Sequence, residues 1–189
     1  MPTPPTSYDL VITGGRVLDP ANNIDAKLDI AVNNGKIAAV EVNIDDSASK
    51  RVIDATGLVV TPGLIDLHTH AAGGIRKPNN DDFMVDPDTA GVSAGVTTIL
   101  DAGSIGALNS GGLVNYLVPT AKTRLLALLN IGKMGVANLP EVKSSSDIDH
   151  ASSVQVIQSA PDIIKGVKAR MVTPGITALG NDMPKAAKA

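Results

Sequence analysis

The chain has 189 residues, of which 43% are hydrophobic and 19% are charged, and it carries a formal net charge of −3. This balance indicates a folded globular protein, and the lack of a basic bias argues against nucleic acid or an anionic membrane surface as a partner. The absence of cysteine excludes disulfides and thiolate metal sites, so any metal must take nitrogen and oxygen ligands.

The N-terminal residues 1–10 contain neither the basic region nor the apolar region of a secretory signal. The sequence also has no run of about 18 apolar residues, which is roughly what a membrane-spanning helix needs. We therefore expect a cytoplasmic protein with no membrane partner.

The first 61 residues have the pattern of short strands joined by tight turns. Apolar and polar residues alternate in three segments, which are residues 8–18, 28–42 and 51–60. Turn signals interrupt these segments at Gly14-Gly15, Asn34-Gly35 and Thr56-Gly57. Asn-Gly is a strong signal for a type I′ hairpin, and each of the other two breaks also predicts a pair of short strands. We expect residues 1–61 to form a small antiparallel β domain.

From Pro62 onward the pattern changes to strands alternating with helices, which is typical of a parallel sheet. Strands are expected at residues 64–70, 96–101, 124–131 and 163–171. Helices are expected from Asp86, from Ser110 to about Thr123 and from Ser146 or Asp147 to about Ala160, with a loop at Gly73-Gly74 and a polar tail after Pro174. Pro119 predicts a break in the second helix. Because aromatic residues are scarce, the core should consist of aliphatic side chains, as suits parallel strands buried on both faces.

The first of these strands, Leu64–His70, is rich in branched apolar residues and is expected to be buried. Side chains alternate along a strand, so Asp66, His68 and His70 share one side. Two imidazoles separated by one residue can bind the same zinc or related transition-metal ion. Such a pair also occurs by chance on exposed strands. The expected burial favours a metal, because burying an imidazole without a partner costs roughly 1–3 kcal/mol.

Four motifs follow one another along the chain. They are PGLIDLHTH at 62–70, GVTTILDAGS at 95–104, LLNIG at 128–132 and GVKARM at 166–171. Together they resemble the amidohydrolase superfamily, and most closely its dihydroorotase-like amidohydrolase/deacetylase branch. The resemblance implies a (β/α)8 TIM barrel that carries one or two divalent metals, with zinc expected, beside a small β domain.

The expected fold is therefore α/β, with a small antiparallel β-sandwich segment before the N-terminal part of a TIM barrel. Residues 1–61 would form part of a composite sandwich, and residues 62–189 would form the first half of the barrel, about four strand-helix units. A complete barrel takes about 250 residues. An open half-barrel exposes strand edges and apolar faces. The chain is thus expected to be a fragment or to need a partner with the other half, and the sequence leaves both alternatives open.

Lys168 is the second candidate ligand. From the residues alone it is an ordinary lysine at the end of a strand, because lysines usually reach solvent. The resemblance of GVKARM to the carbamylated-lysine motif of the family implies instead that Lys168 takes up CO2 and becomes a carbamate that bridges two metals. Lys165 would lie on the opposite face, and His150 is expected to be a solvated residue at the start of the third helix.

Four further residues are candidates for supporting roles. From its residue type Asp66 is a candidate ligand, whereas the resemblance implies a partner that orients a histidine or fixes the strand end. Asp101, Ser104 and Asn130 lie at or just beyond strand ends, where each either hydrogen-bonds substrate or satisfies loop amides. Ser104 lies in no GxSxG motif, which argues against a serine hydrolase. The catalytic residues stay unassigned, because the aspartate base and the other ligands implied by the resemblance would lie beyond the chain.

The expected function is metal-dependent hydrolysis of an amide, cyclic amide or ester, with water activated by the metal. The substrate would be a small molecule, and the full-length parent is expected to be a homo-oligomer. This chain alone is expected to be inactive. The alternative is a non-catalytic scaffold or assembly protein that retains the fold, although such a protein would be free to lose His68, His70 and Lys168.

Overall fold

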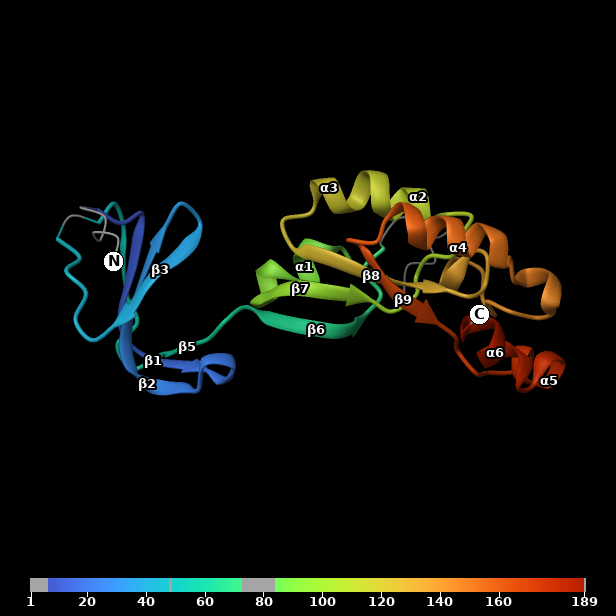
Figure 1. Ribbon diagram of the computed structural model, residues 1–189, viewed down its shortest axis with the longest axis horizontal. Coiled ribbons are helices and arrows are strands. Elements are labelled where there is room, and N and C mark those ends of the chain that lie inside the picture. The colour runs from blue at the N-terminus through green and yellow to red at the C-terminus, as the bar shows by residue number, and fades with distance from the viewer. Residues whose placement is uncertain (1–6, 48, 73–83, 189) are drawn as a thin grey trace. The chain divides into compact units, whose positions relative to one another are not determined.

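The computed structural model describes residues 7–47, 49–72 and 84–188. The chain divides into two compact units, Met1–Pro62 and Gly63–Ala189, so the division falls one residue from the boundary expected from the sequence (Figure 1). The loop expected at Gly73-Gly74 lies outside the described residues. Within the described ranges, no helix has the length and apolar character needed to cross a membrane.

The first unit is a single mixed sheet. Its strands are β1 (Leu10–Asp19), β2 (Ile24–Asn33), β3 (Lys36–Glu41), β4 (Val52–Asp54) and β5 (Val59–Val60), and the 3-10 helix η1 (Pro20–Asn22) joins β1 to β2. The order is β3-β2-β1-β4, with β5 also paired to β1. Strands β1 to β3 are antiparallel, whereas β4 and β5 both run parallel to β1. The expected purely antiparallel domain is therefore wrong, because β4 and β5 lie along β1 instead of pairing with each other.

Two turn signals of this unit have different outcomes. The hairpin expected at Asn34-Gly35 is confirmed, with φ values of 51° and 70° at the two residues. The turn expected at Gly14-Gly15 is wrong, because β1 continues through both glycines with a shift of register opposite β2. Gly14 has a φ of 73°, and its N–H donates to Asp29 Oδ1 at 2.8 Å. The glycine pair thus makes a bulge and not a strand end.

The second unit is built on four parallel strands, as expected. They are β6 (Leu64–Thr69), β7 (Val96–Asp101), β8 (Arg124–Asn130) and β9 (Ile164–Lys168), in that order across the sheet. The helices are α1 (Pro87–Ala90), α2 (Ser110–Gly112), a π-helical turn (Leu113–Leu117), α3 (Val118–Thr120), α4 (His150–Ser159), α5 (Gly175–Leu179) and α6 (Asp182–Lys188). Short 3-10 turns lie at Val92–Ala94, Gly135–Ala137 and Ser145–Asp147.

The helices depart from the sequence expectations in three places. The second expected helix is continuous over α2, the π turn and α3, and it ends one residue after Pro119. The third expected helix begins later than predicted, because Asp149 caps α4 by accepting from Ser152 N at 3.0 Å. The region after Pro174, expected to end in a polar, Ala/Lys-rich tail, contains two helices, and Met183 of α6 is buried.

The core of this unit lies between the sheet and the helices on one of its faces. Ile99, Leu125 and Leu129 are buried there, and apolar residues of the π turn, α3 and α4 pack against them. In Figure 1, α2, α3 and α4 lie along the same face of the sheet. On β8 the alternating positions Leu126 and Leu128 are only partly buried. The expectation of strands buried on both faces is therefore wrong, because the described helices cover a single face.

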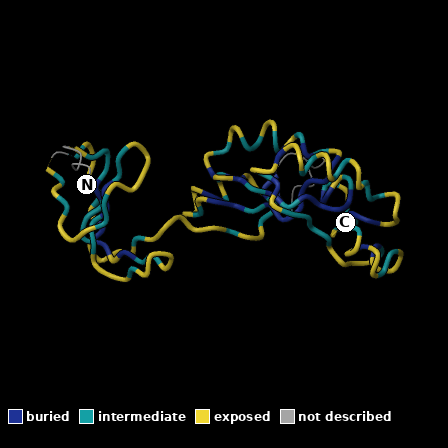
Figure 2. The backbone as a smooth tube through the Cα atoms, viewed as in Figure 1, coloured by how far each residue is buried: buried dark blue, intermediate teal, exposed yellow. Residues whose placement is uncertain are grey.

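Strand β6 is exposed, contrary to the sequence expectation. Leu64, Ile65 and Leu67 keep exposed fractions of 56%, 62% and 70%, whereas β7 and β8 carry the buried segments (Figure 2). The physical reason is position, because β6 is the edge strand of the sheet and pairs with β7 alone among the described strands.

Candidate functional site

The polar residues singled out from the sequence meet at one edge of the parallel sheet. Asp101, Asn130 and Lys168 are the last residues of β7, β8 and β9, and His68 is the next-to-last residue of β6. The carboxyl ends of parallel strands lie at the same edge, which is where barrel enzymes place their chemistry. The local sequence places polar residues at this edge, since the apolar run of each strand ends in a polar residue there.

His68, His70 and Lys168 converge although they come from the two outermost strands of the sheet. The imidazole centroids of His68 and His70 are 6.0 Å apart, with an interplanar angle of 78°. Lys168 Nζ lies 3.5 Å from His68 Nε2, a weak polar contact. Three strand spacings in a flat sheet would separate these strands by roughly 14 Å. Their side chains therefore meet because the sheet curves, as a barrel wall does.

His70 sits in a more enclosed environment than His68. Its Nδ1 is 2.9 Å from the hydroxyl of Ser104, which has no exposed surface. Burial lowers the pKa of His70, and the charges of His68 and Lys168 lower it further, while Asp101 and Glu141 act in the opposite direction. The neutral imidazole that results is the form that binds metals.

Asp101 is fully buried and points into the loop that follows β7. Its carboxylate accepts backbone N–H groups from Ala71 at 2.8 Å, Gly103 at 3.1 Å and Ser104 at 2.7 Å. Of the two roles left open by the sequence, this geometry matches the satisfaction of loop amides. It also ties the segment after β6 to the loop after β7, because Ala71 and Ser104 share one carboxylate.

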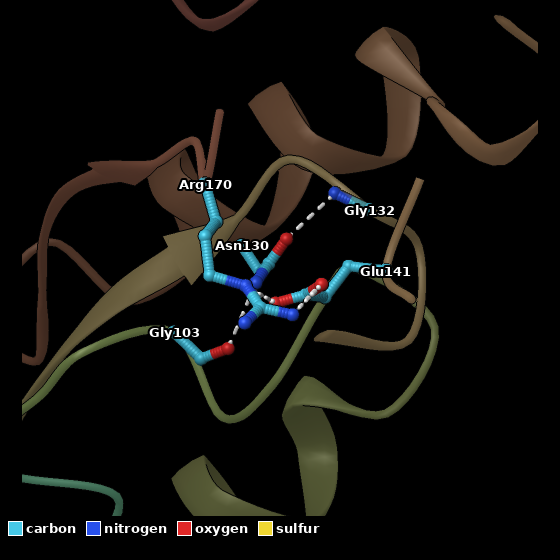
Figure 3. Close-up of polar contacts among 5 residues, drawn as sticks. All are labelled: Gly103, Asn130, Gly132, Glu141 and Arg170. Atoms are coloured by element: carbon cyan, nitrogen blue, oxygen red, sulfur yellow. Dashed lines mark hydrogen bonds and ion pairs between the residues drawn. The ribbon is translucent and has the colours of Figure 1, made fainter. Parts of the chain in front are cut away.

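Asn130 makes a similar connection between two loops, as Figure 3 shows. Its Nδ2 donates to the Gly103 carbonyl at 3.0 Å, and its Oδ1 accepts from Gly132 N at 2.9 Å. With 2% of its surface exposed, Asn130 has both ends of its amide engaged. It therefore holds the loops after β7 and β8 against each other.

The pairing of Glu141 with Arg170 was not predicted from the sequence. The guanidinium binds the carboxylate twice, Nε to Oε1 at 2.8 Å and Nη2 to Oε2 at 2.7 Å (Figure 3). The Glu141 side chain is 5% exposed and that of Arg170 is 44% exposed. Glu141 lies in a segment with no periodic pattern, so its own position gave no sign of the pair. The one sign in the sequence was Arg170, a charged residue two positions after Lys168 and therefore next to the candidate site.

Asp66 acts on the backbone of its own strand. Its carboxylate accepts from His68 N at 2.9 Å and from the Thr69 hydroxyl, and both bonds lower the pKa of Asp66, the Thr69 bond more strongly. The pairing with β7 shifts register between Asp66 and Thr69. Asp66 thus fixes the irregular end of β6, one of the two roles expected for it.

Two residues set aside in the sequence analysis lie away from this cluster. Lys165 Nζ donates to the Pro161 carbonyl at 2.9 Å, and its side chain is directed there and not toward the histidines. His150 is exposed at the first position of α4.

The donor atoms present fit part of a metal site. Across residues 7–47, 49–72 and 84–188, no three His, Cys, Asp or Glu side chains form a group able to hold a metal ion. The cluster consists instead of two imidazoles, one of them favoured in its neutral form, and a lysine amine. Nitrogen donors of this kind suit zinc and related ions, and a carbamate on the lysine would add oxygen.

Three known proteins are similar to this chain in sequence or in structure. A deacetylase from Enterococcus faecalis is 34% identical over 164 residues, which are 87% of this chain and 42% of that protein. The crystal structure of a dihydroorotase has a TM-score of 0.81 at 29% identity and covers 95% of this chain and 48% of its own. An adenine deaminase has a TM-score of 0.77 at 33% identity, with 96% and 46% covered.

No family model matches the chain. The chain spans less than half the length of each of these three proteins. Their similarity extends over nearly all of the chain, and the four parallel strands are those of a partial TIM barrel. The family resemblance drawn from the sequence motifs is thereby confirmed, and the chain belongs to the amidohydrolase superfamily as a dihydroorotase-like member.

Proposed function

We propose that this chain carries part of the active site of a metal-dependent hydrolase that acts on an amide, cyclic amide or ester. The observation that carries the proposal is the convergence of His68, His70 and Lys168 at the carboxyl ends of β6 and β9. These strands lie at opposite edges of the sheet, so the three side chains meet through the fold and not through sequence proximity.

His68 and His70 would hold a divalent metal through imidazole nitrogens, and Lys168 would hold it through a carbamate formed with CO2. When bound, a metal such as zinc supplies Lewis acidity, which activates water and polarises the substrate carbonyl. The chain's own residues prepare this arrangement. Burial favours neutral His70, and Asp66 fixes the backbone that carries His68.

The remaining ligands and the general base belong, in this proposal, to a further part of a longer protein. The relatives support this assignment, because the matched region is 42% of the deacetylase and 48% of the dihydroorotase. Because the similar proteins include a deacetylase and a dihydroorotase, the proposed substrate class is a small amide or cyclic amide.

The carbamate can be tested with a matched pair of lysines on β9. In 13C-bicarbonate, the chain should show a carbamate carbon signal that Lys168→Met removes and Lys165→Met retains, because Lys165 is directed to the Pro161 carbonyl. Zinc stoichiometry, measured by plasma spectrometry, should fall in the Lys168 variant only. A carbamate signal that persists in Lys168→Met would remove Lys168 from the ligand set.

Activity separates the enzyme from a scaffold that keeps the fold. The protein expressed from the complete reading frame, loaded with zinc, should hydrolyse at least one member of a panel of N-acyl amino acids, acylated hydroxy acids, hydantoins and dihydroorotate. Mutation of His68 to Asn should abolish that turnover. A zinc-loaded protein that hydrolyses no member of the panel would favour the scaffold.

A further inference from the structure

The buried hydroxyl of Ser104 contacts a histidine of the candidate site. Its hydroxyl lies 2.9 Å from His70 Nδ1, and the residue has no exposed surface. A side chain so enclosed cannot reach a substrate in this conformation. The neighbour that it does reach is an imidazole of the candidate site.

The loop that carries Ser104 is held in place from two directions. Asp101 accepts the N–H groups of Gly103 and Ser104, and Asn130 donates to the Gly103 carbonyl at 3.0 Å. Asp101 and Asn130 are the last residues of adjacent strands, and both are buried. The position of the Ser104 hydroxyl is therefore fixed by the sheet and not by a free loop.

The same loop lies against the other candidate ligand. A Cβ on Gly103 would lie 2.8 Å from both Cβ and Cγ of Lys168, and the φ of Gly103 is 91°. Only glycine fits this backbone and this close approach to the lysine. One buried loop thus touches both His70 and Lys168.

We infer that Ser104 is a positioning residue whose Oγ accepts the Nδ1–H of His70 and thereby leaves Nε2 unprotonated and free to bind metal. A hydroxyl can donate or accept, and a neutral imidazole carries one N–H. Because Nδ1 faces Ser104, Nε2 is the nitrogen left for a metal, and its lone pair is free only when Nδ1 carries the hydrogen and the hydroxyl oxygen accepts it. Partners of this kind orient metal-binding histidines, and their loss typically lowers metal affinity about 10–100-fold. The inference rests on the proposed function in that it takes His70 as a ligand.

The tautomer can be measured without metal. The metal-free chain, labelled with 15N-histidine and held at pH 8, should give three sets of imidazole signals from its three His, with those of His70 identified by their loss in His70→Gln. Nitrogen shifts and two-bond couplings should show mainly Nδ1–H at His70 in the parent chain. In Ser104→Ala both tautomers should be present.

Ser110→Ala is the matched control. Ser110 is also a buried serine, 7% exposed, but its hydroxyl donates to the Ala107 carbonyl at 3.1 Å and contacts no imidazole. A general effect of removing a buried hydroxyl would change His70 in both variants. The inference is overturned if the parent holds Nε2–H, or if Ser104→Ala leaves the tautomer unchanged.

A zinc titration adds a second measurement. The dissociation constant should rise about 10–100-fold in Ser104→Ala and stay unchanged in Ser110→Ala. An equal affinity of Ser104→Ala and the parent would also overturn the inference. If the protein expressed from the complete reading frame binds no zinc, the proposed function fails, while the tautomer measurement still decides the role of Ser104.

Discussion

Glu141 carries a buried carboxylate whose described partner is the half-exposed guanidinium of Arg170. Breaking a buried pair from one side leaves the other group without its partner, which is more costly than the net value of the pair. This pair joins the segment after β8 to the residues just beyond β9. It therefore braces the same edge of the sheet that bears Lys168.

Replacing Glu141 by Gln should destabilise the chain by about 1–3 kcal/mol, because the bidentate charged contact is lost in a buried setting. Urea unfolding followed by circular dichroism measures this change. The double variant Glu141→Gln with Arg170→Gln should lose less than the sum of the two single variants. Strict additivity would show that the two side chains do not interact.

The exposed pair of Arg16 and Asp25 provides the control. These side chains make a similar bidentate contact, at 2.6 and 2.7 Å, but are 60% and 53% exposed. Solvent screens such a pair, so Arg16→Gln should leave the unfolding midpoint nearly unchanged. A loss equal to that of Glu141→Gln would mean that burial is not the deciding factor.

At the scale of elements, the short helix α1 is fixed to the sheet by a carboxylate. Asp88 of α1 accepts from Lys122 N at 2.9 Å and Thr123 N at 2.8 Å, next to the start of β8. These backbone bonds, the one from Thr123 first, lower the pKa of Asp88. A carboxylate with a lowered pKa stabilises the folded state above the ordinary Asp pKa of about 3.9, and this stability is lost as the pH falls through the folded value.

Asp88→Asn should therefore unfold more easily than the parent at pH 7, with a difference that shrinks below pH ~3.9. Thermal unfolding at pH 7 and at several values down to pH 3 gives the comparison. Asp162→Asn serves as the control, because Asp162 is exposed in the turn between α4 and β9 and its replacement should change the stability little at either pH. A difference that is constant across this range would rule out the ionised carboxylate as its source.

Element starts were predictable where a local chemical signal was unique. Asp86-Pro87 gave the start of α1, since Asp86 caps the helix and Pro87 occupies its first position. The predicted start of α4 was wrong because three residues near it are able to cap a helix. Ser144 and Asp147 form the capping box of a 3-10 turn, and Asp149 caps the helix itself. Because these candidates lie close together in the chain, local propensity does not choose among them.

At the scale of the whole second unit, the edge strand β6 exposes large apolar side chains to solvent. Ile65 and Leu67 of β6 are 62% and 70% exposed, and among the described strands only β7 pairs with β6, along one of its two sides. Edges of this kind associate with other strands unless charge or proline blocks them.

The 189-residue chain should therefore self-associate, and Ile65→Lys with Leu67→Lys should reduce this, because lysines on an edge strand oppose strand addition. Sedimentation velocity over a range of concentrations measures the effect. Tyr116→Lys is the control, because Tyr116 is 74% exposed but lies on the helical segment and not on the edge. Equal association of the β6 variant and the parent would exclude this edge as the contact.

The sequence by itself determined where the strands of the second unit lie, that they are parallel, and the family. The apolar runs that end in Asp101, Asn130 and Lys168 are local signals. They predicted the strands correctly because strand formation there depends on residues close in the chain. The HxH pair was visible for the same reason, since two imidazoles on one strand need no long-range contact to share a side.

Only the tertiary structure decided which residues meet and which are buried. Lys168 reaches His68 across one hundred positions because the sheet curves, and β6 is exposed because it lies at the sheet's edge. The contact of Ser104 with His70 and the ion pair of Glu141 with Arg170 likewise became visible only in the structure. Such pairings depend on contacts between distant segments, and a periodic pattern carries no information about them.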